Sequence, residues 1–488
     1  MAGTEAAALT AHKMFIDGEW RPAQSGETST SSSPATGEQI GTVPQGDRAD
    51  AQRAIDAANR AFGDWSRYSA FERAGKMHAV GDAIVSRRDE LARTLTLDQG
   101  KPLRTEAYDE VDELVEYWRM AAEDAKRLGG ELPNSSTRGK RVLLVRRARG
   151  VVGVISPWNW PYTMPAELIA PSLACGNTVV WTPAPSTAIC AVALAECVVE
   201  ADLPPGVFNL VTGPGPVVGD EIARSRGTQA VAFIGSTATG RIVSSAAAGK
   251  ATVIEMGGNG PVVVMEDADL DAAVEATVAA CFLCAGQSCT AGERILVHSA
   301  VRDDFVDRLA RRVTERVLLG DPFDDATTMG PVNNDQIAGK MDEHVADAVD
   351  RGAGVVVGGA RAAGFPTGLY WQPTVLTDVS ADSLAATEET FGPIAPVVSI
   401  SSLDEAIEMT NASPYGLLAA IWTRDLAAGL RFADRVNTGW VNVNESSNYW
   451  EAHLPFGGRS GTDSGLGRVG GANVMHTFSE LQTVTLNA

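Results

Sequence analysis

The sequence predicts an α/β protein, because two successive runs of short apolar strands alternate with helical segments. In the first run, strands rich in β-branched residues recur about every 22 to 29 residues, which is the spacing of β-α-β units. Their side chains are almost continuously apolar, as is typical of parallel strands that helices cover on both faces. The 488 residues suffice for about three folded units.

Helices are expected to precede the first sheet. Residues 1–50 are polar, with a short hairpin expected at Met14–Trp20 and a loop over Ser25–Thr36. Residues 47–129 then carry apolar side chains at helical spacing, as in Glu110–Lys126.

The strands of the two sheets are expected at regular positions after Val142. The first run contains Val151–Ile155, Thr178–Trp181, Val207–Val211, Ala230–Ile234 and Thr252–Ile254. The second run contains Pro261–Met265, Arg294–His298, Gly354–Val357, Ala395–Ile400, Leu417–Trp422 and Gly439–Asn444. Helices such as Val301–Val317 and Leu403–Asn411 are predicted between the strands of the second run.

Two further segments, Arg141–Arg147 and Thr477–Leu486, alternate apolar and polar residues in the manner of edge strands. Exposed strand edges usually need a partner. We therefore expect these segments to pair between subunits of a homo-oligomer, either a homodimer or a homotetramer.

The charge of the chain limits its partners. The 61 acidic and 40 basic side chains give a formal net charge of −21, whereas a nucleic-acid partner normally requires a basic face. An anionic membrane surface is disfavoured for the same reason, and no apolar stretch approaches the length of a membrane-spanning helix. We expect a small-molecule ligand rather than nucleic acid or a membrane.

The cysteines and the N-terminus favour a cytoplasmic protein. Six cysteines in so long a chain do not form a disulfide framework, so free thiols in a reducing compartment are expected. Met1–Leu9 lacks the basic and apolar regions of a secretory signal.

Cys289 is the first candidate for chemistry. It lies in Gly286-Gln-Ser-Cys-Thr-Ala-Gly292, where the flanking glycines allow backbone to approach a ligand closely. Most cysteines are simply small buried side chains, and that interpretation is open for this residue alone. A metal site formed with Cys281 and Cys284 is disfavoured, because no second ligand pair follows and the two could pack one helical turn apart.

Two polar residues follow buried strands. Glu255 ends the apolar run Ala251–Met256, and burial there would raise its pKa into the range of a general base. Asn159 lies in Pro157-Trp-Asn-Trp-Pro161, where prolines fix the backbone and the amide could donate to an oxyanion. A solvated glutamate and a turn asparagine are the structural alternatives.

A glycine turn follows the strand Ala230–Ile234. In Gly235-Ser-Thr-Ala-Thr-Gly240 the backbone N–H groups at a helix start could bind phosphate. Ser236 as an ordinary helix cap explains the pattern equally well.

Together, six motifs in this order resemble the aldehyde dehydrogenase superfamily over nearly the whole chain. They are Pro157-Trp-Asn-Trp-Pro161, Phe233-Ile-Gly-Ser-Thr237, Glu255-Met-Gly-Gly-Asn259, Gly286-Gln-Ser-Cys289, Glu389-Thr-Phe-Gly-Pro393 and Pro455-Phe-Gly-Gly458. The combination is far more specific than any one motif, and it favours Cys289 as a nucleophile.

The resemblance implies a Rossmann-type nucleotide-binding domain, an α/β catalytic domain and a small β oligomerisation arm. The nucleotide-binding domain would comprise residues 1–125 and 148–256, and the catalytic domain residues 257–435. The arm would comprise 126–147 and 474–488, and 436–473 would return to line the active site.

The resemblance also implies the reaction, which is NAD(P)-dependent oxidation of an aldehyde to the acid, without coenzyme A. Cys289 would form a thiohemiacetal and then a thioester, Asn159 would hold the oxyanion, and Glu255 would activate the hydrolytic water. The cofactor would contact Ser156, Trp158, Thr182, Pro185, Gly235, Ser236, Glu389 and Phe391. The substrate pocket would include Trp160, Met164, Glu167, Ser288, Thr290, Trp450 and Phe456.

Three departures from the family pattern bear on the cofactor and the protons. Thr182-Pro-Ala-Pro185 replaces the usual lysine and glutamate that hold the adenosine ribose, so NAD and NADP both stay open, with NAD preferred. The segment between Gly235 and Glu255 is about three residues shorter than in many members. Gly467–Ala472 lacks the acidic residue that serves many relatives as a second proton-relay group.

The substrate is not specified by these motifs. The aromatic residues suggest an apolar or moderately sized aldehyde, and the expected pocket has no obvious basic anchor, although Arg104 or Arg119 could supply one. The alternatives in function are a coenzyme A-dependent acylating dehydrogenase, a cysteine hydrolase with His298 or His453 as base, and a non-catalytic binding protein.

Overall fold

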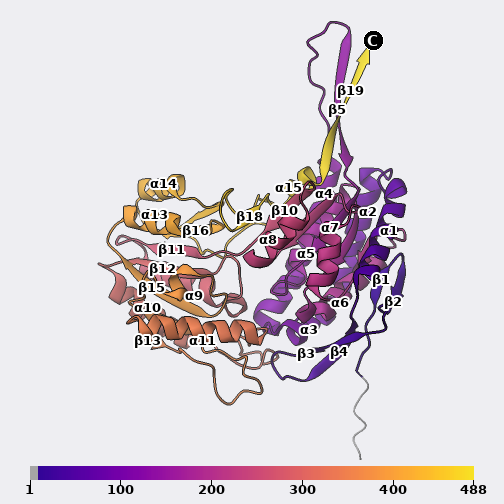
Figure 1. Ribbon diagram of the computed structural model, residues 1–488. Helices are drawn as coiled ribbons and strands as arrows, with labels where there is room; N and C mark the ends of the chain where they lie inside the picture. The colour runs from indigo at the N-terminus through magenta and orange to yellow at the C-terminus, as the bar shows by residue number, and fades with distance from the viewer. Residues whose placement is uncertain (1–8, 488) are drawn as a thin grey trace, which may run out of the picture.

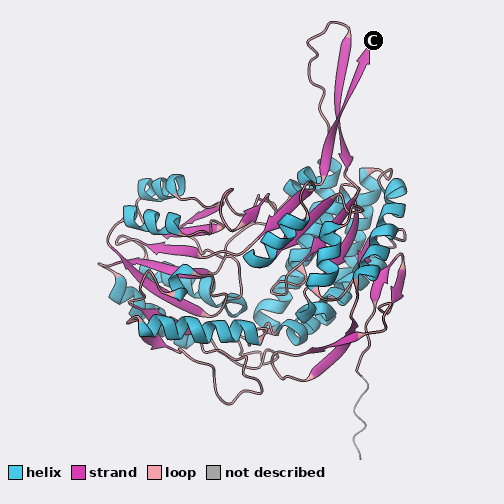
Figure 2. Cartoon of the chain, in the orientation of Figure 1, coloured by secondary structure: helices cyan, strands magenta, loops and turns pink. Residues whose placement is uncertain are grey.

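Two α/β bodies lie side by side, and a two-stranded ribbon projects from one of them (Figure 1). The computed structural model describes residues 9–487, so the expectation for Met1–Leu9 lies outside the described residues except for Leu9. Helices cover the sheets of both bodies, as Figure 2 shows. The predicted α/β class is confirmed.

The first body is built on an eight-stranded sheet of order β18-β10-β9-β6-β7-β8-β1-β2. Its parallel centre consists of β6 (Val151–Ile155), β7 (Thr178–Thr182), β8 (Phe208–Leu210), β9 (Ala230–Ile234) and β10 (Ala251–Glu255). Antiparallel strands flank this centre: β1 (Met14–Ile16), β2 (Glu19–Arg21) and β18 (Gly465–Leu466). The predicted hairpin is confirmed, because Asp17 and Gly18 join β1 to β2 in left-handed conformations.

The second body is built on a seven-stranded sheet of order β13-β14-β15-β12-β11-β16-β17. Its strands are β11 (Gly260–Val264), β12 (Gly292–His298), β13 (Gly354–Val357), β14 (Thr374–Thr377), β15 (Ile394–Ile400), β16 (Leu418–Trp422) and β17 (Trp440–Val443). All neighbours are parallel except β13 and β14.

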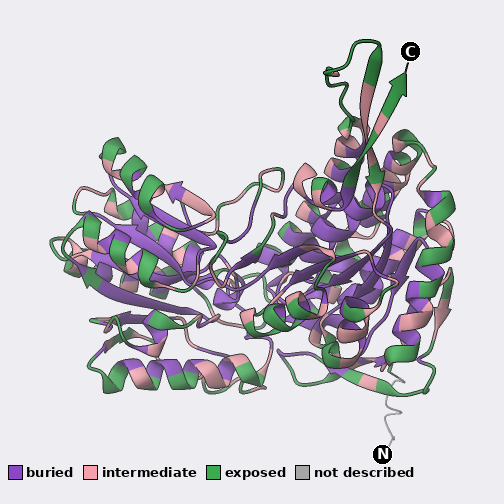
Figure 3. Ribbon diagram, turned by 45° about the horizontal axis from the view of Figure 1, so that its top comes forward, coloured by how far each residue is buried: buried purple, intermediate pink, exposed green. Residues whose placement is uncertain are grey.

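The helices lie around these sheets, and their apolar faces pack inward (Figure 3). The first body carries α1 (Arg48–Trp65), α2 (Ala70–Ser86), α3 (Arg88–Gln99), α4 (Tyr108–Arg127), α5 (Thr163–Ala174), α6 (Ala188–Glu200), α7 (Asp220–Arg224), α8 (Thr237–Ala246) and α15 (Ala472–Thr477). The second carries α9 (Leu270–Phe282), α10 (Arg302–Arg316), α11 (Asp335–Asp350), α12 (Leu384–Thr387), α13 (Leu403–Ala412) and α14 (Leu426–Arg435). Within residues 9–487, none of the helices combines the length and apolar character that crossing a membrane requires.

The projecting ribbon corrects one prediction. β5 (Lys140–Ala148) and β19 (Ser479–Asn487) pair antiparallel within one chain, from Ser479↔Ala148 to Asn487↔Lys140. The expected pairing of these two segments between subunits is therefore wrong, because each already satisfies one edge of the other. The outer edge of β5 is covered at Leu144, which exchanges two backbone hydrogen bonds with Glu131, whereas most residues of β19 are exposed (Figure 3).

Two local predictions also fail. The expected loop over Ser25–Thr36 contains the strand β3 (Thr28–Ser32), which pairs with β4 (Gln39–Pro44) although its side chains are all Thr or Ser. Cys284 does not continue the helix of Cys281, because α9 ends at Phe282 and Cys284 has a φ of 53°. The two cysteines therefore do not pack one helical turn apart.

Candidate active site

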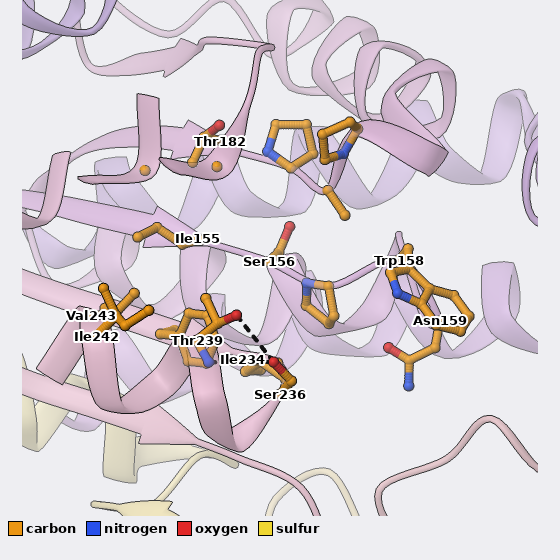
Figure 4. Close-up of a pocket in the computed structure, with 18 of the residues that line it drawn as sticks. Ile155, Ser156, Trp158, Asn159, Thr182, Ile234, Ser236, Thr239, Ile242 and Val243 are labelled. Carbon is orange, nitrogen blue, oxygen red and sulfur yellow. Dashed lines mark hydrogen bonds between the residues drawn. The ribbon is translucent and has the colours of Figure 1, made fainter. Parts of the chain in front are cut away.

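A cavity of about 830 Å³ opens at the carboxyl ends of β6, β7 and β9, where parallel strands of the first sheet meet the second body. Such crevices are the usual ligand sites of open α/β sheets. Figure 4 shows Ser156 between Thr182 on one side and Ser236 and Thr239 of the α8 segment on the other. All eight residues predicted to contact the cofactor line this cavity: Ser156, Trp158, Thr182, Pro185, Gly235, Ser236, Glu389 and Phe391.

The start of α8 forms one wall of the cavity. Ser236 caps the helix by accepting a hydrogen bond from the Thr239 N–H, and it also contacts the Thr239 hydroxyl at 3.1 Å (Figure 4). A side chain at Gly235 would meet the Phe233 ring at 2.7 Å, so glycine keeps the turn open. The positive end of the helix dipole thus faces a cavity large enough for a dinucleotide.

The opposite wall carries an unused polar group. The Thr182 hydroxyl is buried and has no hydrogen-bond partner, whereas the Ser156 hydroxyl accepts one from the Trp181 indole at 2.8 Å. Buried hydroxyls normally have a partner. A bound ribose hydroxyl would supply it, so the residues present fit a pyridine nucleotide.

Glu389 and Phe391 are held firmly at the far end of the cavity. Glu389 accepts the Gly258 N–H at 2.9 Å, and a side chain at Gly257 would meet its carboxylate at 2.4 Å. Phe391 has a φ of 59° and lies edge-on to Trp158, with ring centroids 5.7 Å apart. A non-glycine residue in this conformation is strained, which indicates a functional constraint.

Cys289 follows a strained segment and lies in the turn that precedes β12. Cys284, Ala285 and Gly286 all have positive φ angles, and the Cys284 N–H donates to Glu106 at 3.0 Å. Cys289 is partly exposed, whereas the other five cysteines are buried. Burial and the neighbouring Glu255 raise the pKa of the Cys289 thiol well above its ordinary value. The thiol therefore needs a base to become a nucleophile.

Asn159 joins the end of β6 to the turn before Cys289. Its side-chain amide is buried and donates to the Gln287 carbonyl at 3.0 Å. The amide nitrogen carries two protons, so the second is free to donate to a ligand oxygen.

Glu255 ends β10 and is buried, and one of its carboxylate oxygens has no partner. Burial raises the pKa of Glu255 to about 8; Glu389 adds to this effect and the Cys289 thiol opposes it. The group is therefore mostly protonated at neutral pH, and its ionised form, which can act as a base, increases as the pH approaches 8.

A second, narrow pocket of about 20 Å³ meets the first cavity at four residues. Cys289, Glu255, Met164 and Ile234 line both. All seven residues predicted for the substrate pocket line the narrow one: Trp160, Met164, Glu167, Ser288, Thr290, Trp450 and Phe456. The structure thus places Cys289 and Glu255 where the two spaces join.

Several lining residues escaped prediction. Lys340 of α11 and Asp220 of α7 line the large cavity, and Ile234 and Val469 line the narrow pocket. No motif surrounds Lys340 or Asp220, so only the packing of α11 and α7 brings them to the cavity. Arg104 and Arg119, considered as substrate anchors, instead form exposed ion pairs with Asp325 and Asp82.

The fold and the joined cavities define a nucleotide-dependent enzyme, and comparison with known proteins gives its family. Residues 20–484 match the model of the aldehyde dehydrogenase family. The 3-sulfolactaldehyde dehydrogenase of Pseudomonas putida is 37% identical to this chain over 98% of it and 97% of the relative. The chain therefore belongs to the aldehyde dehydrogenase family and is an oxidoreductase that acts on aldehydes with a pyridine nucleotide.

Two solved structures are similar over nearly the whole chain. A structure described as an E. coli NADP-dependent enzyme has a TM-score of 0.95 and 36% identity, covering 99% of this chain and 100% of that one. The betaine aldehyde dehydrogenase of Staphylococcus aureus, solved with NAD+, has a TM-score of 0.94 and 34% identity, covering 98% and 95%. The fold is thus shared by an enzyme described as NADP-dependent and by one solved with NAD+.

Proposed function

We propose that this chain oxidises a small aldehyde to the carboxylic acid through a thioester on Cys289. The observation that carries the proposal is the position of Cys289 and Glu255 at the junction of the large cavity and the narrow pocket. A substrate carbon in the narrow pocket would thereby meet the nucleophile, the base and the cofactor together.

The first step forms a bond between Cys289 Sγ and the aldehyde carbon. Glu255 accepts the thiol proton, and the carbonyl electrons move to oxygen. The second proton of the Asn159 amide and the Cys289 backbone N–H are suited to hold that oxyanion. Asn159 also fixes the turn before Cys289, so the amide donor and the thiol keep their relative positions.

The second step requires an electron-pair acceptor. An oxidised nicotinamide held in the large cavity would supply the acceptor for the hydride that the thiohemiacetal carbon loses. Phe391, packed edge-on against Trp158, and Glu389, hydrogen-bonded to Gly258, would orient it. The collapse of the oxyanion then leaves a thioester on Cys289.

The last step hydrolyses the thioester. Glu255, after losing its first proton to solvent, takes a proton from water while the oxygen bonds to the acyl carbon and the C–S bond breaks. The leaving Cys289 thiolate takes the proton that Glu255 accepted, so the carboxylic acid and the free thiol result. A carboxylate that activates water would be redundant in a coenzyme A-dependent reaction.

We infer a preference for NAD over NADP from the end of the cavity near Thr182 and Pro185. Asp220 also lines the cavity, and it binds Arg48 at 2.8 Å and Arg224 at 2.6 Å. Among the described lining residues, Lys340 is the one lysine or arginine, and it acts electrostatically on Glu389. A 2′-phosphate near Thr182 would therefore meet a carboxylate rather than a free cation.

An oligomer built through the ribbon also stays a proposal. Most residues of β19 are exposed, and Leu481 and Leu486 of β19, with Leu132 in the segment beside β5, present apolar side chains to solvent. Such a surface suits a second copy of the chain, in a homodimer or homotetramer. The cytoplasmic location is likewise a prediction, which depends on the six free thiols.

The test is the rate of reduced-nicotinamide formation from a panel of aldehydes, with NAD or NADP and without coenzyme A. We expect turnover, with the carboxylic acid as product. Cys289→Ala should abolish it, whereas Cys197→Ala, a buried cysteine of α6, is the matched control. A strict requirement for coenzyme A, or ester hydrolysis with no nucleotide bound, would contradict the proposal.

A further inference from the structure

The narrow pocket contains a carboxylate that the proposed reaction does not use. Glu167 lies in α5, is 3% exposed and lines the pocket together with Cys289. Its Oε1 atom is buried and has no hydrogen-bond partner. The Gly470 backbone N–H donates to this carboxyl group, but a buried carboxylate oxygen without a partner is costly, so Oε1 suits a ligand that offers a proton donor or a positive charge.

Basic side chains are missing from this pocket. Its described lining contains no lysine, arginine or histidine, but it contains two carboxylates, those of Glu167 and Glu255. The Lys101 ammonium approaches the Trp160 ring at 3.8 Å, yet it is bound to Glu110 at 2.6 Å and does not line the pocket. An aldehyde with a carboxylate or sulfonate would thus face two acidic groups and no counter-charge.

The remaining walls are aromatic. Trp160, Trp450 and Phe456 line the pocket, and the Trp450 and Phe456 rings lie 5.6 Å apart. Ring faces attract cations, most strongly where water is excluded. Aromatic walls beside a carboxylate therefore favour an organic cation over a neutral or anionic ligand.

The charge state of Glu167 depends on what enters the pocket. Burial raises the pKa of Glu167 well above its ordinary value, and Glu113 and Glu255 add to the effect. A cation bound at Oε1 would stabilise the ionised form.

Resting on the function proposed above, we propose that Glu167 binds the primary ammonium group of a short aldehyde substrate. An N–H donor suits the free Oε1, whereas a quaternary ammonium has none to give. Because the pocket is narrow, we expect a short chain between the ammonium group and the aldehyde. Glu167 is thus a specificity-determining residue for amino aldehydes.

The experiment compares 3-aminopropanal with butanal, which has the same size but no charge, and with succinate semialdehyde, which is anionic. At pH 7.5 we expect kcat/KM for 3-aminopropanal to exceed that for butanal by at least about tenfold. A hydrogen bond between charged groups strengthens binding by about this factor, so the difference should come mainly from a lower KM for the amine. Succinate semialdehyde should be the poorest of the three. Equal values for the amine and butanal, or preference for the anion, would overturn the proposal.

Variants of Glu167 test whether this residue causes the preference for the amino aldehyde. Glu167→Gln should bring the ratio between the amine and butanal close to one, and Glu167→Asp, which keeps the charge, should restore part of it. A ratio unchanged in Glu167→Gln would contradict the assignment. An equal loss of kcat for both aldehydes, with the ratio retained, would instead identify Glu167 as a proton-transfer group.

A binding measurement separates this inference from the proposed reaction. In the absence of turnover, 3-amino-1-propanol should protect Cys289 from iodoacetamide at least about tenfold more effectively than 1-butanol, and only with Glu167 intact. If no aldehyde is oxidised but 3-amino-1-propanol still protects Cys289, the proposed reaction is contradicted and the ammonium site is supported. If butanal is oxidised but the amine is preferred neither in kcat/KM nor in protection of Cys289, the ammonium site is contradicted and the proposed reaction is supported.

Discussion

The side-chain amide of Asn159 donates a hydrogen bond of 3.0 Å to the carbonyl of Gln287, two residues before Cys289. This bond links the end of β6 in the first body to the turn that carries the nucleophile in the second. One residue thus both positions the cysteine and offers a second amide proton to the oxyanion.

Asn159→Ala should lower kcat by roughly 100- to 1,000-fold, the effect of losing one oxyanion donor. KM for the nucleotide should change little, because the amide serves the aldehyde oxygen. Steady-state rates with saturating nucleotide measure this. The matched control is Asn411→Ala, whose amide also donates to a backbone carbonyl but lines neither cavity. Equal rates for the two variants would remove Asn159 from the mechanism.

The pKa of Glu255, raised to about 8 by burial, predicts the pH dependence of steady turnover. The carboxylate form is the base, so kcat should rise with pH and level off above about 8. In Glu255→Gln the rising limb should disappear together with steady turnover. A pH profile that is flat between 6 and 9 in the wild-type enzyme would show that another group limits hydrolysis.

The buried pair of Lys101 and Glu110 should show strong coupling in stability. Lys101→Met leaves the Glu110 carboxylate without its counter-charge and should lower the free energy of unfolding by about 3–5 kcal/mol. Lys101→Met combined with Glu110→Gln should recover most of this, since Gln keeps an acceptor for the Tyr162 N–H. Thermal or urea unfolding measures both. Additive losses in the double variant would contradict the coupling.

Asp220 should control cofactor choice. Asp220→Ser removes a carboxylate from the cavity wall and frees Arg224, while Arg48 keeps its contact with Glu221, so the ratio of kcat/KM for NADP to that for NAD should rise by about tenfold or more. The control is Glu221→Ser, because Glu221 also binds Arg48 but does not line the cavity. A similar change in both variants would show that the cavity-lining position of Asp220 does not matter.

The sequence predicted the parallel strands well because periodicity and burial agree there: β9 has the predicted bounds, Ala230–Ile234. It missed β3, whose Thr and Ser residues carry no apolar pattern, and β14, which has only four residues between loops. The pairing of β5 with β19 joins segments more than 300 residues apart, and local patterns hold no information about such a contact.

The site residues were predicted from their motifs, and the structure brings those residues to two joined spaces. Local sequence could not give the unpartnered oxygen of Glu167 or the position of Lys340. Both depend on which helices pack around the cavity. The motifs therefore identify the chemistry, whereas the packing of α5, α7 and α11 shapes what the cavity can bind.

The most direct test of the central claim is to mix Glu255→Gln with NAD and an aldehyde substrate and to follow the first turnover. Because glutamine cannot accept the thiol proton, we predict a first turnover slower than that of the wild-type enzyme, which stops at one equivalent of reduced nicotinamide per active site. The mass of an acyl group should then be found on the peptide that contains Cys289. A burst without acyl label, label on another cysteine, or continued turnover at the wild-type rate would contradict the thioester mechanism.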